Sequence, residues 1–74
     1  MSQAIRDREP RRREGLAVAT ELKKWATRPS DRLYTDLMIG RLTDAKTYAD
    51  VNRIACIMEK RLHDQTMKKL GQNL

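Results

Sequence analysis

The sequence predicts an all-α fold, a small three-helix domain that follows a flexible basic N-terminal tail. The 74-residue chain is 35% charged and contains only three Gly, two Pro and no Phe. Its apolar residues recur at spacings of three and four, the period of an amphipathic helix, and no alternation long enough for a strand is present. We therefore expect a disordered Arg-rich tail at residues 1–14 and one three-helix domain at residues 15–74.

The tail is predicted from its charge. Residues 1–14 hold five arginines and three acidic residues, and burial of their few apolar groups would not offset the entropy lost on ordering. Pro10 is expected to end any helix that reaches it, or to lie in the first turn of the next one. Arginine forms bidentate bonds with phosphate, so five residues are candidates for binding nucleic acid or a partner: Arg6, Arg8, Arg11, Arg12 and Arg13. The alternative is a solubilising tail, because interleaved acids dilute the positive charge.

The first helix is expected from about Gly15 to Thr27. Val18, Leu22 and Trp25 are spaced by four and three residues and so share one face. Pro29 interrupts the pattern, since the residue before a proline is disfavoured in the α region. Trp25 is able to stack on a nucleic-acid base, but its helical spacing favours a core position or a partner contact.

The second helix is expected to start near Ser30, a favourable N-cap, with Asp31 in its first turn. It continues to about residue 42. Apolar residues occupy a wide arc of this helix, with Leu33, Leu37 and Gly40 on one face and Ile39 and Leu42 on the other. This arc predicts a central position, covered by both neighbouring helices. Gly40 is expected to end the helix or to let another helix approach closely.

The third helix, Thr47 to Leu70, is the longest periodic segment. Thr47 is an N-cap candidate, and Gly71 follows the segment as a typical C′ residue. One apolar stripe is predicted to face the core: Tyr48, Val51, Ile54, Ala55, Met58 and Leu62. At 1.5 Å per residue the helix would run roughly 35 Å, so its last two turns are expected to project or to meet a partner.

Several function classes are not favoured by the sequence. It contains no P-loop, GxGxxG or GxSxG motif, so we expect no enzyme activity and no cofactor. Cys56 and His63 are single residues of their kinds, and two ligands do not form a zinc site, so no metal is expected. No apolar run approaches the roughly 20 residues that cross a bilayer. The early arginines do not fit a signal peptide. A cytoplasmic protein with one reduced cysteine and no membrane contact is the simplest expectation.

The net charge of +6 favours polyanionic partners such as DNA, RNA or an acidic protein surface. Residues 32–61 allow a helix-turn-helix interpretation in which the third helix reads DNA. Its candidate contacts include Arg53, Lys60 and Arg61, together with Asn52. The turn between Gly40 and Thr47, however, is longer than that motif uses. Basic residues on a helix also commonly form a solvated face.

In size and make-up the chain resembles the small basic regulators that bacteriophages and plasmids encode. That resemblance implies a non-enzymatic regulatory binding protein. We expect it to dock on a host protein that handles nucleic acid, such as RNA polymerase, and to modulate transcription with its basic tail near the nucleic-acid path. Two alternatives stay open. One is a helix-turn-helix-like DNA-binding regulator, expected to be a dimer. The other is an assembly factor that self-associates through its long C-terminal helix.

Overall fold

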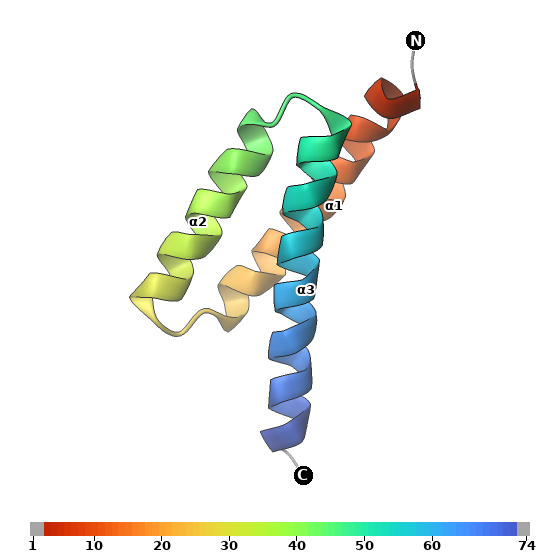
Figure 1. Cartoon of the computed structure of the whole chain (residues 1–74). Helices are drawn as coiled ribbons and strands as arrows, with labels where there is room; N and C mark the ends of the chain where they lie inside the picture. Colours follow the sequence, from red (N-terminus) through yellow and green to blue (C-terminus); the bar gives the residue numbers. More distant parts are fainter. Residues whose placement is uncertain (1–2, 73–74) are drawn as a thin grey trace.

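The computed structural model describes the backbone of residues 3–72 and the side chains of residues 7–71. It contains three helices, α1 (Gln3–Trp25), α2 (Pro29–Asp44) and α3 (Tyr48–Gln72) (Figure 1). Residues 3–72 contain no β-strand. The predicted all-α, three-helix fold is therefore confirmed.

The three helices differ in how they meet. α1 and α3 run in the same direction, while α2 runs back between their ends in the opposite direction (Figure 1). The α1–α3 interface is the most extensive of the three. The Cα trace is elongated, with extents of 49 × 24 × 14 Å. The predicted central position of the second helix is wrong, because the α1–α3 pair forms the centre and α2 packs along it.

The core is built from residues at alternating spacings of three and four, the pattern of closely aligned helices. Its buried members come from all three helices and from Ala26, which directly follows α1: Ala19, Leu22 and Ala26, then Thr35, Met38 and Leu42, then Val51, Ala55 and Met58. The predicted stripe of the third helix is confirmed at its centre, since Val51, Ala55 and Met58 are fully buried. In α2, by contrast, Leu33 is 70% exposed and Leu37 is 54% exposed. α2 turns its Thr35–Met38–Leu42 side inward instead.

Gly15 lies where α1 closely approaches the other two helices. It is buried in the middle of α1, where a Cβ atom would lie 2.8 Å from Leu42 Cδ2 and 3.3 Å from Ala55 Cβ. A side chain at this position would therefore force the Leu42 side chain to shift and would press on Ala55. Gly40, which was expected to end its helix or admit a neighbour, does neither. α2 continues to Asp44, and nothing lies within 4 Å of a Cβ at Gly40.

The largest correction concerns the N-terminus. α1 begins at Gln3 instead of Gly15, and it contains Pro10. The predicted tail at residues 1–14 is thus wrong for residues 3–14, while Met1 and Ser2 lie outside the described residues. The physical reason is that the side chains of Arg11 and Arg12 are only 15% exposed and form hydrogen bonds with the other helices. The prediction had counted these charges as solvated.

The helix ends follow one of the expected signals and depart from two. The Asp50 N–H donates to Thr47 Oγ1 at 3.1 Å, which confirms Thr47 as the N-cap of α3. α2 instead starts at Pro29, the favoured first helical residue, and Arg28 in the N-cap position makes no side-chain cap. Ser30 therefore lies inside the first turn. Gly71 does not act as the predicted C′ residue, because α3 continues to Gln72.

Candidate functional site

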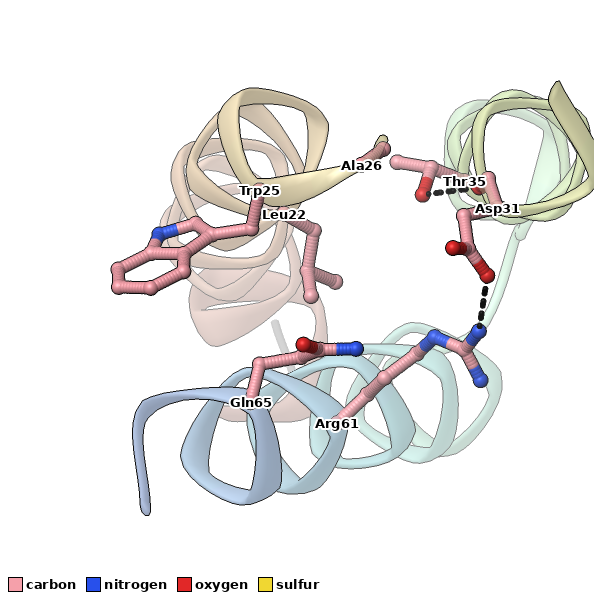
Figure 2. Close-up of a pocket in the computed structure, with 7 residues that line it drawn as sticks. All are labelled: Leu22, Trp25, Ala26, Asp31, Thr35, Arg61 and Gln65. Atoms are coloured by element: carbon pink, nitrogen blue, oxygen red, sulfur yellow. Dashed lines mark hydrogen bonds and ion pairs between the residues drawn. The ribbon is translucent and has the colours of Figure 1, made fainter. Parts of the chain in front are cut away.

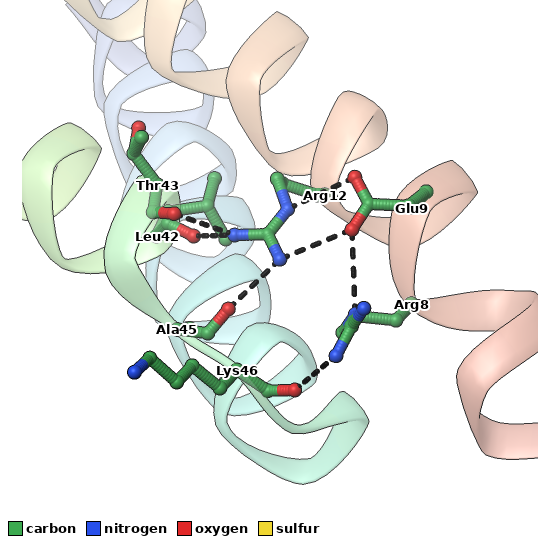
Figure 3. Close-up of polar contacts among 7 residues, drawn as sticks. All are labelled: Arg8, Glu9, Arg12, Leu42, Thr43, Ala45 and Lys46. Carbon is green, nitrogen blue, oxygen red and sulfur yellow. Dashed lines mark hydrogen bonds and ion pairs between the residues drawn. The ribbon is translucent and has the colours of Figure 1, made fainter.

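Arg12 closes the end of α2 against α1 (Figure 3). Its guanidinium donates to three carbonyl oxygens at the C-terminus of α2, those of Leu42, Thr43 (2.9 Å) and Ala45 (2.8 Å). These carbonyls have no partner within their own helix, and they form the negative end of the helix dipole. Glu9 holds the same guanidinium from the other side at 3.2 Å. Arg12 is therefore a C-terminal cap supplied by a neighbouring helix.

Arg11 joins α1 to α3. Its two terminal nitrogens bind both carboxylate oxygens of Glu59, at 2.7 and 2.9 Å, and its Nε donates to Asn52 Oδ1 at 2.9 Å. Glu14 adds a further contact at 2.8 Å. The hydrogen bonds with Glu59 raise the pKa of Arg11, and the same bonds lower the pKa of Glu59. We call the Arg11–Glu59–Asn52 group the α1–α3 clasp.

The predicted arginine arm is therefore not a free cluster. Arg8 donates to the Lys46 carbonyl, and Arg11 and Arg12 are held as described above. Of the five predicted candidates, Arg13 is exposed on the outer side of α1, and the Arg6 side chain lies outside the described residues. These arginines lie in a row along one helix, but three of them bind the protein itself. One feature of the sequence indicates that some of these arginines face the other helices. Arg8, Arg12 and Gly15 are spaced by four and three residues, so they share one face of α1.

The candidates on α3 separate into two groups. Arg61 pairs with Asp31 at 3.3 Å and lies 4.2 Å from the centre of the Tyr34 ring. Arg53 and Lys60 are exposed and lie on one side of α3, since seven residues make about two helical turns. Asn52, the other expected base reader, is held in the α1–α3 clasp.

The α2–α3 connection also differs from the expected one. It spans only residues 45–47, because α2 extends to Asp44. The two helices then lie side by side in opposite directions (Figure 1). A helix-turn-helix motif would instead cross its two helices at about 90–120°.

A small cavity lies between the end of α1, the start of α2 and the C-terminal half of α3 (Figure 2). Its volume is about 10 Å³, and the lining side chains include Leu22, Thr35 and Arg61. Such a space holds about one water molecule. It is too small for a ligand, and the Thr35 hydroxyl is already satisfied by the Asp31 carbonyl at 2.9 Å.

The larger hollow is a groove of about 400 Å³ between α2 and α3. Its apolar lining comes from Met38, Ile54 and Ile57, and its positive charges come from Arg41 and Arg53. Asp44 and Asp50 also line it, one turn from the arginines on their own helices. Within residues 7–71, none of these four charged side chains forms an ion pair with another residue. The groove therefore combines apolar contact area with charges that are available to a partner.

Two further exposed apolar side chains, Leu33 and Leu37, belong to α2 but are not part of the lining of this groove. Leu33 and Leu37 lie on the same side of α2 as Arg41, at intervals of four residues. Ile57 on α3 is 42% exposed. We call these exposed residues of the two helices the α2–α3 face; the group comprises Leu33, Leu37, Arg41, Arg53, Ile57 and Lys60. The sequence prediction missed its apolar part, because it assigned Leu33 and Leu37 to the interior.

The described part of the chain contains no group of three His, Cys, Asp or Glu residues that could hold a metal ion. It also contains no helix with the length and apolar character needed to cross a bilayer. No protein-family model, no curated protein and no solved structure matches this chain.

Proposed function

We propose that this protein is a non-enzymatic regulatory binding protein that docks on a partner through the α2–α3 face. The observation that carries the proposal is the exposure of Leu33, Leu37 and Ile57 on the two helices that also present Arg41 and Arg53. Neither arginine forms an ion pair with another side chain of residues 7–71. Exposed apolar groups that gather on one surface are a mark of protein–protein interaction sites. Because Asp44 and Asp50 line the groove together with Arg41 and Arg53, the matching partner surface offers apolar side chains with charged groups of both signs beside them.

The partner class that we propose is a host protein that handles nucleic acid, such as RNA polymerase. Support comes from the net charge of +6 and the small size of the chain, which suit a regulator that binds close to a polyanion. The mechanism is steric and electrostatic, since an occupied surface changes what can pass along it. We place this activity in the cytoplasm, where such partners act.

The test is direct binding to purified bacterial RNA polymerase, measured by biolayer interferometry with the immobilised chain. We expect Ile57→Asp or Leu37→Asp to weaken the complex at least tenfold, because each places a carboxylate in the apolar part of the interface. Both side chains are largely exposed, so neither substitution opens the core. Ala17→Asp, on the exposed side of α1, is the matched control and should bind like the wild type.

Two results would contradict parts of the proposal. Equal binding by Ile57→Asp and Ala17→Asp would exclude the α2–α3 face as the docking surface. No binding to polymerase at micromolar concentration would exclude that partner, and pull-downs with the wild type and Ile57→Asp would then show whether the face binds another protein. A dimeric mass at micromolar concentration that Ile57→Asp converts to a monomer would favour self-association instead.

A further inference from the structure

The positive charge of the chain is concentrated at one end of the molecule. Residues 21–32 contain four cations and two acids, and residues 60–69 contain four cations and one acid, so together they carry +5 of the net +6. The first segment holds the end of α1 and the start of α2, and the second is the C-terminal half of α3. These segments lie together at the lower end of the molecule (Figure 1).

Trp25, the single tryptophan of the chain, lies at this end. Its ring is partly exposed and points outward from α1, away from Asp31 (Figure 2). Lys69 Nζ lies 4.4 Å from the ring centre. The ring also forms one wall of a hollow of about 280 Å³, whose other lining residues are Thr27, Gln65, Lys68 and Lys69. An aromatic face, polar side chains and ammonium groups therefore share one open hollow.

We propose that this hollow binds single-stranded nucleic acid, with one base stacked on Trp25 in place of the Lys69 ammonium and the adjoining phosphates near Lys68 and Lys69. An aromatic platform within a positively charged groove is the usual chemistry of single-strand binding. Thr27 and Gln65 supply hydrogen-bonding groups at the edge of the stacked base. A duplex fits less well, because its base faces are covered by their neighbours in the stack.

The same geometry has a purely structural explanation, in which Lys69 and Trp25 only fasten the end of α3 to α1. The two explanations differ in what the exposed cations do. Arg28 and Lys68 form no ion pair with another side chain of residues 7–71, and a structural contact does not need them. Nucleic-acid binding does need them, because each phosphate that is neutralised releases counterions.

The test uses the emission of Trp25 in the full wild-type chain, so the primary readout needs no substitution. A single strand of about 12 thymidines, within the usual site sizes, should quench this emission saturably at low salt. The logarithm of the binding constant should fall with the logarithm of salt concentration with a slope of about −2, as expected for roughly three phosphates. An abasic strand of equal length should bind at least tenfold more weakly and cause no quenching.

A matched pair of charge reversals locates the site. Lys68→Glu should weaken binding of the thymidine strand about tenfold. Lys46→Glu, an exposed lysine at the opposite end of the molecule, makes the same change in net charge and should have less than about a twofold effect at 0.15 M salt, where charges are screened beyond roughly 8 Å.

Four results would overturn the inference. They are absence of quenching, equal binding of the abasic strand, tighter binding of a duplex of the same length, and equal effects of the two charge reversals. None of them bears on docking through the α2–α3 face, which is tested separately with polymerase.

Discussion

Arginine side chains have several structural roles in this chain, and the groups around each arginine determine its role. Arg12 caps the C-terminus of α2, Arg11 joins α1 to α3, and Arg61 covers the Tyr34 ring. Arg53 faces solvent in the α2–α3 groove. A guanidinium offers five donors in a rigid plane, and its apolar stem can lie along other side chains. The same residue type therefore provides interior bonds in α1 and surface charge in α3.

Replacing Arg12 tests the cap. Arg12→Met keeps most of the apolar stem but removes the bonds to three α2 carbonyls, so we expect the free energy of unfolding to fall by about 2 kcal/mol. Urea unfolding followed by circular dichroism measures this change. Arg13→Met is the control at the next position, where the side chain is exposed, and its effect should stay within about 0.5 kcal/mol. Equal effects at the two positions would contradict the cap.

The α1–α3 clasp predicts a pH dependence. The bonds with Arg11 hold the pKa of Glu59 in the folded protein below the unfolded value, which is about 4.3 for glutamate. The stabilisation is thus present above that unfolded value and is lost as pH falls through the folded pKa. Because Glu59 is 41% exposed, we expect Glu59→Gln to cost at most about 1 kcal/mol at pH 7.

Urea unfolding at two pH values measures the effect of the clasp. As pH falls through the lowered folded pKa of Glu59, the carboxylate becomes neutral, so the difference between Glu59→Gln and the wild type should shrink toward zero at the lower pH. Glu21→Gln, in the exposed pair with Lys24, controls for the general effect of a lost surface carboxylate. A Glu59→Gln difference that is equally large at both pH values would show that the effect is not electrostatic.

At the scale of the elements, Gly15 determines how closely the helices pack. A side chain at this position would meet Leu42 and Ala55, so we expect Gly15→Val to lower the free energy of unfolding by about 2 kcal/mol through overpacking. Gly40→Val is the matched control, since the space around Gly40 is open and valine has the higher helix propensity. Its unfolding midpoint should be unchanged or slightly raised. Similar losses for both variants would contradict the close approach at Gly15.

The elements also show what the sequence could and could not predict. Periodicity was sufficient for α3, because its apolar stripe is narrow and its Thr47 cap is explicit. It was not sufficient for α2, whose apolar residues surround the helix, so that packing alone decides which side is buried. It also failed for residues 3–14, because burial of arginine depends on acceptors that come from other helices. Partners distant in sequence leave no periodic signal.

On the scale of the whole molecule, the candidate sites depend on which charged side chains are bonded within the fold and which are exposed. Five arginines near the N-terminus suggested an arm for nucleic acid, yet Arg11 and Arg12 are bonded within the folded body. The two candidate binding surfaces are instead the α2–α3 face and the cationic end around Trp25. Sequence analysis identified some of their charges, Arg53 and Lys60. It could not identify the apolar part of the face, because exposure is decided by how the three helices pack.

The central claim is that the segment before Gly15 belongs to the folded body. The most direct test is the thermal melt, by circular dichroism, of the chain without residues 1–14 beside the full chain. Removal of the Arg12 cap and the α1–α3 clasp should cost about 3 kcal/mol or more, which lowers the Tm of a domain this small by roughly 12–24 °C. A truncated chain that melts at the same temperature as the full chain would contradict the account.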